Sequence, residues 1–160
     1  MRYHKVTTTT RLFKPEDAKA FHDLNIAWIK QHFVVEDKDR KTLEQPESSI
    51  LGIGGRIVVA EIDGEMVGTA ALVPISAGKV ELAKMCVSSR HRGAGIGKAI
   101  MARVDFEAKD MGANTIWLES NTVLDAAMHL YQRSGFRELT DNECTPSPYE
   151  RCNIQMQKSL

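Results

Sequence analysis

Apolar residues recur every three or four positions in two long segments of the chain, and this spacing predicts two amphipathic helices. The first helix begins at Pro15, a favoured first helical residue, and ends near Gln31. Its apolar face consists of Ala18, Phe21, Leu24 and Trp28. The second helix follows a glycine-rich segment and ends at Gly112. Its apolar face consists of Ile96, Ile100, Val104 and Ala108.

Two shorter helices are expected from local signals. One covers residues 38–44 and is broken by Gln45 and Pro46, because proline disfavours a helical conformation at the residue before it. The other begins at a capping pair, Thr122 and Asp125, and ends before Gly135. Residues 52–55 are expected to form a loop.

Short runs of alternating or buried-type residues between turn signals predict the strands. Asp63 and Gly64 form a strong hairpin signal between residues 57–62 and 66–73. A turn at 74–78, beginning at Pro74, separates this hairpin from the next strand. The expected strands are residues 3–12, 57–62, 66–73, 79–87, 115–118, 136–139 and 151–157.

This order of elements predicts an α/β or α+β fold with a mostly antiparallel sheet. One parallel strand pair is expected where the long second helix crosses over between strands. The chain has no internal repeat, low-complexity tract or linker, so a single domain is expected over residues 1–160.

Composition excludes several classes of protein. Hydrophobic residues make up 42% of the 160 residues, and Lys plus Arg equals Asp plus Glu at 21 each. No global charge therefore favours nucleic acid or a membrane surface, and no apolar run approaches the roughly 20 residues of a membrane span. The N-terminus lacks the apolar region of a secretory signal, and three cysteines without metal-ligand spacing fit a reduced cytoplasmic setting and no metal.

The segment from Arg92 to Gly97, Arg-Gly-Ala-Gly-Ile-Gly, is the most informative in the chain. It lies between an apolar strand and a helix, where glycines let backbone N–H groups approach an anion at the helix N-terminus. This arrangement suits a pyrophosphate. The Rossmann fingerprint does not match, and the Walker motif fails because Ala99 follows Gly97 and Lys98.

The chain resembles the GNAT superfamily of acetyl-CoA-dependent N-acetyltransferases. Arg92, Gly95 and Gly97 match the family's glycine motif, and residues 127–136 are similar to its fourth-helix signature, in which a tyrosine precedes a Gly-Phe turn. The resemblance implies a sheet of about six to seven strands flanked by about four helices. It also implies acetyl-CoA as acyl donor and CoA as product.

The resemblance assigns the donor site residue by residue. In the family two strands separate and leave backbone groups free for the pantetheine arm, and Met85, Cys86 and Val87 occupy that position here. The amides of Gly93, Ala94, Gly95, Ile96 and Gly97 would hold the pyrophosphate, assisted by the side chains of Arg92 and Lys98. Asn121 would hydrogen-bond the cofactor or a bridging water, although asparagine is also common in turns before helices.

Two residues are the candidates for catalysis. Tyr131, by resemblance, faces the coenzyme sulfur as general acid; the alternative is a tyrosine that only packs on an apolar face. Strand alternation predicts that Glu81 shares a face with Ala83, Met85 and Val87, where an apolar setting would raise the pKa of its carboxyl and suit a general base. An ion pair of Glu81 with Lys79 or Lys84 is the alternative, as is a water relay without a dedicated base.

The acceptor is a primary amine by resemblance, and its identity stays open. In the family the first two helices and their loop wall this site, which makes Trp28, Phe33 and Glu36 acceptor contacts. Tyr149, in the loop before the last strand, would close the site from the other side, and Glu119, at the end of the fifth strand, is also assigned to it. Glu119 and Glu36 are weaker candidates for the base. A non-catalytic acyl-CoA sensor or interaction module is the other hypothesis, although such a module has no reason to retain Tyr131 and Glu81. Pairing through the final strand would give a homodimer.

Overall fold

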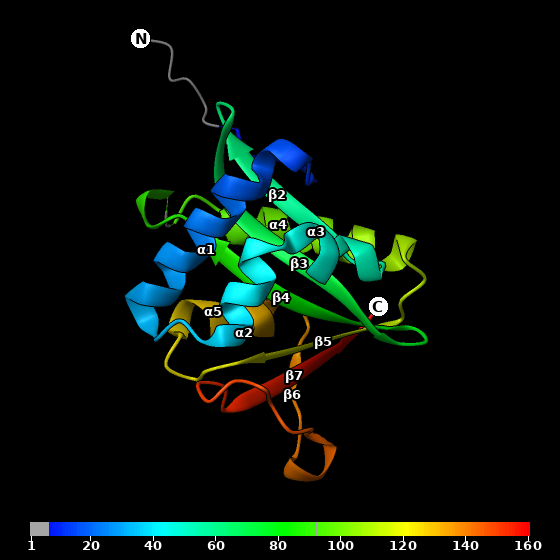
Figure 1. Ribbon diagram of the computed structural model, residues 1–160. Coiled ribbons are helices and arrows are strands. Elements are labelled where there is room, and N and C mark those ends of the chain that lie inside the picture. Colours follow the sequence, from blue (N-terminus) through cyan, green and yellow to red (C-terminus); the bar gives the residue numbers. More distant parts are fainter. Residues whose placement is uncertain (1–6, 92) are drawn as a thin grey trace.

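The computed structural model describes residues 7–91 and 93–160, and within these ranges seven strands form a single sheet. The strand order is β1-β2-β3-β4-β5-β7-β6, and only β4 and β5 are parallel (Figure 1). The strands are β1 Thr9–Leu12, β2 Arg56–Ile62, β3 Glu65–Ser76, β4 Lys79–Val87, β5 Thr115–Ser120, β6 Arg137–Glu138 and β7 Ile154–Ser159.

Helices cover both faces of the sheet: α1, α2 and α3 lie on one face, and α4 and α5 on the other (Figure 1). The helices are α1 Ala18–His32, α2 Asp37–Glu44, α3 Pro46–Ser49, α4 Ile96–Asp110 and α5 Asp125–Arg133. In the described ranges, no helix has the length and apolar character needed to cross a membrane. The predicted class, a mixed and mostly antiparallel sheet between helices, is confirmed.

Several predicted boundaries are wrong for identifiable reasons. Strand β3 continues through Pro74 to Ser76, because the proline lies beside an irregularity in the β3–β4 pairing. Pro46 does not merely end a helix but begins α3, and Leu51–Ile53 forms a 3-10 turn in the expected loop. Strand β7 begins at Ile154 rather than at residue 151, so the last loop is longer than predicted. The N-terminal part of the first predicted strand, residues 3–6, lies outside the described ranges.

The predicted cap of the last helix is also wrong. Helix α5 begins at Asp125 without a side-chain cap. The Thr122 hydroxyl instead accepts a hydrogen bond from Asn153, and the Thr122 amide donates to the same side chain at 3.0 Å. These contacts tie the segment before α5 to the residue that precedes β7.

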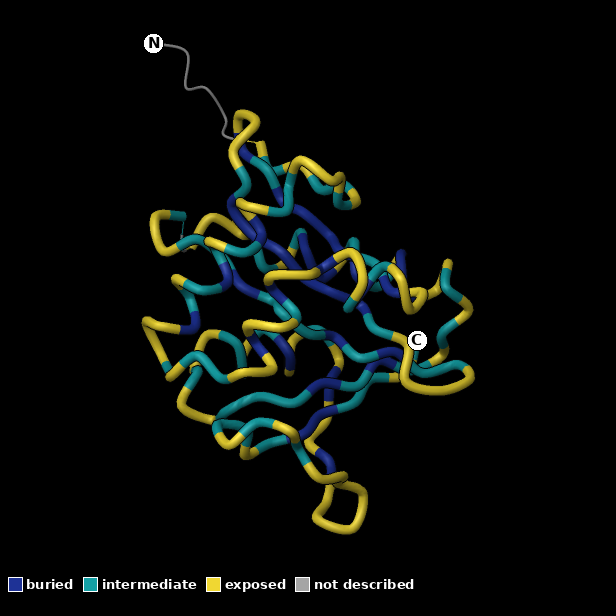
Figure 2. Tube along the Cα trace, in the orientation of Figure 1, coloured by how far each residue is buried: buried dark blue, intermediate teal, exposed yellow. Residues whose placement is uncertain are grey.

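Two apolar cores stabilise the sheet, one on each face, and the buried segments in Figure 2 follow its central strands. The larger core packs α4 and α5 against the sheet through residues such as Ile100, Val104 and Tyr131. The smaller core packs Phe21 and Ile29 of α1 against the opposite face. Each side chain of a central strand therefore belongs to one of two distinct environments.

Strands β4 and β5 pair over a short stretch only. The parallel register joins Lys79 to Thr115, Val80 to Ile116 and Glu81 to Trp117. Beyond Glu81 the described residues of the two strands form no further pairs, while β4 continues to Val87. The strands thus separate toward their carboxyl ends and open a gap within the sheet.

A β-bulge in β4 reverses the facing of the residues that border this gap. Thr69 pairs with Cys86 and Ala71 with Ala83, so β4 contains one more residue than β3 between these pairs. The backbone φ of Lys84 in the bulge is +48°. Met85 and Val87 consequently pack with the α4–α5 core. The prediction that they share a face with Glu81 is wrong, because alternation fails across the inserted residue.

Candidate active site

A cavity of about 890 Å³ passes through the gap between β4 and β5. It extends from the N-terminus of α4 to the space between the sheet and helices α1 to α3. Fifteen of the residues expected in the site border it: Trp28, Phe33, Glu81, Met85, Cys86, Val87, Gly93, Gly95, Ile96, Gly97, Lys98, Glu119, Asn121, Tyr131 and Tyr149. Ala94 and Glu36 do not border it, and Arg92 lies outside the described residues.

The glycine-rich segment forms one end of the cavity. Gly95 precedes α4 with a φ of +74°, a backbone conformation that glycine adopts without strain. A Cβ on Gly97 would lie 3.0 Å from Leu130 Cδ2, so glycine permits close packing of α4 on α5. The first turn of α4 thereby presents its amides at the cavity, a geometry that suits phosphate oxygens.

His91 is a residue at this end that the sequence did not single out. It borders the cavity, and its buried Nδ1 atom has no hydrogen-bond partner among the described residues. His91 lies between two arginines, and such a sequence does not indicate whether the histidine faces a cavity or solvent.

The open edge of β4 lies beside the glycine-rich end. Cys86 and Val87 pair with Thr69 and Gly68 of β3 on one edge of the strand. On the other edge, in the portion that the structure describes, they have no pairing with β5. An extended amide-bearing chain could therefore hydrogen-bond this edge as an additional strand does.

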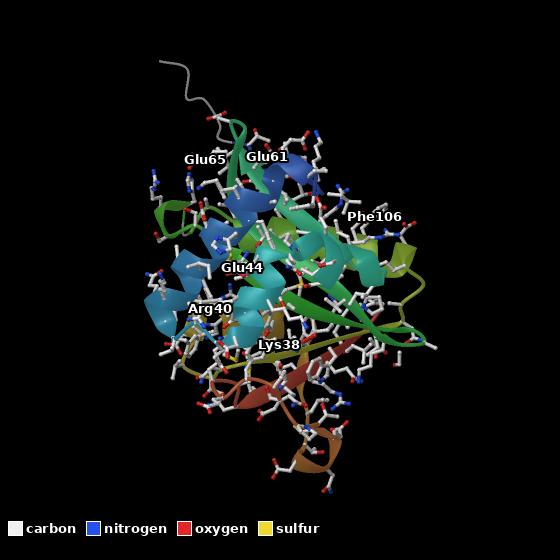
Figure 3. The ribbon with its side chains drawn as sticks, in the orientation of Figure 1. Lys38, Arg40, Glu44, Glu61, Glu65 and Phe106 are labelled. Carbon is white, nitrogen blue, oxygen red and sulfur yellow. The ribbon has the colours of Figure 1, made fainter. Side chains whose placement is uncertain are left out.

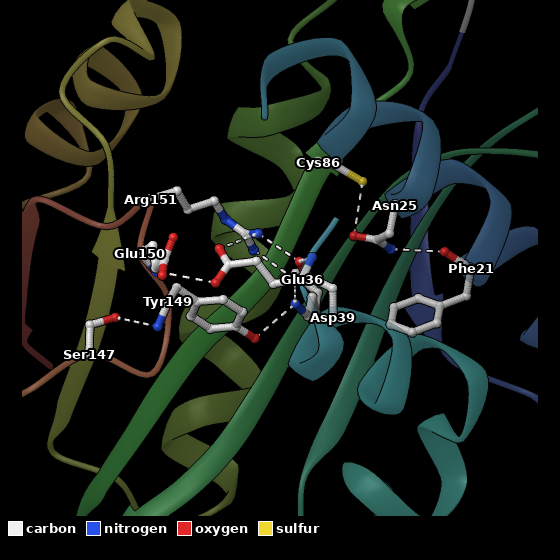
Figure 4. Close-up of polar contacts among 10 residues, drawn as sticks. Phe21, Asn25, Glu36, Asp39, Cys86, Ser147, Tyr149, Glu150 and Arg151 are labelled. Carbon is white, nitrogen blue, oxygen red and sulfur yellow. Dashed lines mark hydrogen bonds and ion pairs between the residues drawn. The ribbon is translucent and has the colours of Figure 1, made fainter. Parts of the chain in front are cut away.

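A buried polar network holds the bulge that shapes this edge. Asn25 of α1 donates to Thr69 Oγ1 at 3.1 Å, and Thr69 donates to the carbonyl of Lys84 at 3.0 Å. Figure 4 shows the Cys86 thiol directed at Asn25, with Sγ 3.4 Å from Oδ1, and Asn25 donating to the carbonyl of Phe21. Helix α1 is thus fastened to β4 at the bulge. The sequence feature that indicates this network is Asn25, a polar residue within the apolar face of the first helix.

Tyr131 lies on the α5 side of the gap. It is buried, and its ring packs edge-on against Phe136 with 5.8 Å between centroids. Burial raises the pKa of the phenol to about 12, with a further contribution from the nearby Cys86 thiol. Tyr131 therefore remains protonated near neutral pH and can donate a proton, while its packing also matches the purely structural alternative.

Glu81 and Glu119 lie on the other side of the gap. Burial raises the pKa of the Glu81 carboxyl, and the negative charge of Glu119 raises it further. Oε2 of Glu119 is buried without a hydrogen-bond partner among the described residues. Neither Lys79 nor Lys84 pairs with Glu81; the Lys84 ammonium binds Asp39 and Tyr149 instead. The carboxylates of Glu81 and Glu119 thus lie in the cavity without a cationic partner from the described chain.

A buried charge cluster joins three segments beside these carboxylates. Asp39 of α2 is fully buried and accepts two hydrogen bonds from Arg151, at 2.6 and 2.7 Å, and one from Lys84 at 2.7 Å (Figure 4). Burial opposes ionisation of Asp39, but the hydrogen bonds from Arg151 and Lys84 outweigh it and hold its pKa far below the ordinary value. This cluster has no local sequence signal, because its three charges are far apart along the chain.

Two expected acceptor contacts belong to the rim of this cluster. The Glu36 carboxylate accepts from the backbone N–H of Glu150 at 3.2 Å and from Arg151 at 3.4 Å. Tyr149 accepts a hydrogen bond from Lys84 at 3.1 Å, and the Arg151 guanidinium lies 4.4 Å from its ring centroid. Glu36 thus fixes the β6–β7 loop, and Tyr149 borders the cavity as part of that loop.

Asn121 is engaged by the protein itself. Its Oδ1 accepts from the backbone N–H of Val123 at 2.9 Å, and its Nδ2 donates to the carbonyl of Arg151 at 2.7 Å. This is the turn role that the sequence left as the alternative. Asn121 borders the cavity while it anchors the last loop to the end of β5.

Aromatic residues form the wall of the cavity opposite the sheet. The Trp28 ring lies 6.4 Å from Phe33 and 4.9 Å from His32, measured between centroids. Trp28 and Phe33 come from the end of α1 and the residue after it. This wall faces the side of the sheet that carries Glu81.

A sheet that opens after one short parallel pairing, with a glycine-rich helix N-terminus at the opening, defines an acyl-CoA-dependent transferase fold. Residues 54–138 match the family model described as the acetyltransferase (GNAT) domain. The chain belongs to this family, which confirms the resemblance to the GNAT superfamily. The matched residues include β2 to β6 and both helices of the α4–α5 face.

Individual relatives agree with this assignment. The chain is 37% identical to rat N-acetyltransferase 8F1 over 95 residues, which are 56% of this chain and 43% of that protein. It is 32% identical to rat N-acetyltransferase family 8 member 2 over 118 residues, 71% of this chain and 52% of the relative. The chain thus spans about half the length of these relatives.

Solved structures confirm the fold. An acetyltransferase of the GNAT family from Staphylococcus aureus Mu50 superimposes with a TM-score of 0.87 at 21% identity, covering 96% of this chain and 99% of that one. The protein yncA from Salmonella typhimurium, solved with its cofactor acetyl-CoA, gives a TM-score of 0.73 at 18% identity, covering 96% and 94%. In the described ranges the sheet has seven strands, within the predicted six to seven, and there are five α-helices rather than about four.

Proposed function

We propose that this chain transfers the acetyl group of acetyl-CoA to a primary amine by direct attack within a ternary complex. The observation that supports this most is the separation of β4 and β5 after Glu81, beside the glycine-rich start of α4. It leaves a strand edge and a set of helix amides at one continuous cavity, with Tyr131 on one side of the gap and Glu81 on the other. One opening thus receives a donor and an acceptor from opposite faces of the sheet.

The donor is held mainly by backbone. The edge of β4 at Met85, Cys86 and Val87 pairs with the pantetheine amides, and the amides between Gly93 and Gly97 bind the pyrophosphate. Lys98 borders the cavity at this end and supplies a positive charge. Arg92, which precedes these amides in sequence, supplies a second one.

The chemistry requires a neutral amine and a protonated leaving group. The Glu81 carboxylate accepts a proton from the bound ammonium, directly or through a water. The amine nitrogen then forms a bond to the thioester carbonyl carbon, and the carbon–sulfur bond breaks. Tyr131 donates its phenolic proton to the departing thiolate, and its pKa of about 12 keeps the hydroxyl protonated until that step. The attacking nitrogen releases its second proton to solvent as the amide forms, and an equivalent proton returns to the Tyr131 oxygen.

Thermal unfolding with acetyl-CoA, CoA or ATP at matched concentrations tests the donor assignment. We expect acetyl-CoA and CoA to raise the melting temperature and ATP to leave it unchanged, because a ligand that binds the folded state stabilises it by mass action. The absence of a shift with any CoA species would contradict the proposal.

Thiol release from acetyl-CoA in the presence of amines tests catalysis. Loss of the acid should lower kcat of Tyr131→Phe by about a hundredfold or more while the KM for acetyl-CoA stays within about twofold. An unchanged kcat would remove Tyr131 from the mechanism. Binding of acetyl-CoA without release of thiol to any amine would favour a non-catalytic acyl-CoA-binding module.

A further inference from the structure

The acceptor end of the cavity combines two unpaired carboxylates with apolar walls. We infer that the acceptor is a primary amine with an aromatic or aliphatic body and no second charged group. This inference rests on the proposed function and specifies the substrate class of the same site.

The floor of this end is built from small and apolar side chains. Ala71 pairs with Ala83 across β3 and β4, and Val73 pairs with Glu81. Paired residues direct their side chains to the same face of the sheet, so a shallow apolar hollow lies directly beside the Glu81 carboxylate. Ala83 is only half-buried although it lies in a central strand, because it borders the cavity.

The roof is apolar as well. It consists of Trp28, Ile29 and Phe33 from the α1 side, and of Ile50 and Ile53 from the segment after α3. Ile53 is 56% exposed while it borders the cavity, so the channel reaches solvent at this point. An amine held at Glu81 would therefore extend an apolar body between Ala83 and this roof.

The charged side chains at this end favour an acceptor cation beside the sheet and disfavour an acceptor carboxylate. Lys84 and Arg151 border the cavity, but the carboxylates of Asp39 and Glu36 together neutralise them. The Lys38 ammonium, at the start of α2 (Figure 3), lies 5.2 Å from the centroid of the Tyr149 ring. Two free carboxylates, Glu81 and Glu119, therefore face one unpaired ammonium at this end of the described cavity.

A second ammonium in the body of the acceptor would lack a partner. The channel toward Ile53 offers the hydroxyls of Thr42 and Ser49 but no carboxylate among the residues that border it. Transfer of an unpaired charge from water into such surroundings is unfavourable. The geometry thus favours monoamines over diamines.

Three matched comparisons of acceptors test the inference with acetyl-CoA at saturation. We expect kcat/KM for 2-phenylethylamine to exceed that for ethylamine by at least about tenfold, from burial of the added apolar surface. Phenylalanine, which adds only a carboxylate, should lose at least about tenfold against 2-phenylethylamine. Hexylamine should exceed 1,5-diaminopentane by a similar factor. Equal or reversed ratios in the first pair, or in both of the others, would overturn the inference.

A substitution in the floor of the cavity tests where the apolar part of the acceptor binds. Ala83→Leu places a larger side chain in the open hollow and should raise the KM for 2-phenylethylamine at least about tenfold, with the KM for acetyl-CoA within about twofold. Ala102→Leu, the same change on the exposed face of α4, should leave both constants unaltered. Equal effects of the two substitutions on the amine would contradict the placement.

The outcome separates this inference from the proposed function. If no amine releases thiol, the proposed function fails, and calorimetric titration of the same amines into protein saturated with CoA still ranks them. Tighter binding of 2-phenylethylamine than of phenylalanine and ethylamine would then support the substrate class. If thiol is released only with diamines or amino acids, the function stands and the substrate class is wrong.

Discussion

The Lys84 ammonium lies 2.7 Å from a carboxylate oxygen of Asp39, and the two side chains are 7% and 0% exposed. Lys84 occupies the bulge of β4, and Asp39 lies in the first turn of α2, so this ion pair joins the donor-side strand to a helix above the acceptor site. Burial lowers the pKa of Lys84, and the hydrogen bond with Asp39 opposes that change. Arg151 completes the pairing and brings the β6–β7 loop to the same point.

Removal of the Asp39 charge should therefore destabilise the fold strongly. Asp39→Asn leaves Lys84 without its counter-ion and Arg151 with Glu36 alone, and loss of one partner from such a buried cluster costs about 3–5 kcal/mol. Urea unfolding would measure this loss as a lower midpoint. Asp37→Asn is the matched control, because Asp37 is exposed on the same helix and its ion pair is with the exposed side chain of Arg40. An equal midpoint for both variants would contradict the importance of the cluster.

The network at the bulge offers a second test. Thr69→Val keeps the shape of the side chain but leaves the Lys84 carbonyl without the Thr69 donor and one of the two amide hydrogens of Asn25 without an acceptor, which should cost about 1–3 kcal/mol. Because the bulge fixes the open edge of β4, we also expect a higher KM for acetyl-CoA. Thr115→Val on β5 removes a hydroxyl that donates to its exposed neighbour Asn114 and should change neither quantity. A loss of stability without any change in the KM for acetyl-CoA would contradict a role of this network in acetyl-CoA binding.

The fold class was predictable from the sequence because its signals are local. The Asp63-Gly64 hairpin, the helical spacing of Ile96 to Ala108 and the glycine-rich segment all lie where the pattern placed them. The bulge was not predictable, since Lys84 adopts a positive φ that is uncommon for lysine and strand alternation assumes an unbroken pleat. That one residue decides which face Met85 and Val87 occupy.

The residues that border the cavity were predictable at its glycine-rich end and only partly at its opposite end. The three glycines 93, 95 and 97 lie within one short segment of the sequence, whereas Asp39, Lys84 and Arg151 meet only through the fold. Glu36 and Asn121 were recognised as site residues, yet their side chains bind the β6–β7 loop. Polar residues that fix a loop beside a cavity have the same composition as those that contact a ligand.

The raised pKa of Glu81 implies that its charge opposes folding. Burial and the charge of Glu119 favour the protonated form in the folded state, so stability is full below the unfolded pKa and falls as the pH rises through the folded one. Glu81→Gln should therefore raise the melting temperature at pH 7.5 and change it little at pH 4. Glu65→Gln, in the exposed hairpin, is the control and should have no effect at either pH. A lower melting temperature for Glu81→Gln at pH 7.5 would contradict the assigned environment.

Substitutions of two glycines at opposite ends of α4 can distinguish the effect of backbone strain from an effect on acetyl-CoA binding. Gly95 and Gly112 have φ values of +74° and +81°, and a Cβ on either would meet no atom within 4 Å. Replacement by alanine should thus cost each variant a similar free energy of unfolding, about 1–2 kcal/mol, because an L-residue is strained in this conformation. Gly95 borders the cavity whereas Gly112 lies at the far end of the helix. We expect the KM for acetyl-CoA to rise at least about fivefold in Gly95→Ala and to stay unchanged in Gly112→Ala. If both variants keep the parental KM, the phosphates do not bind against the start of α4.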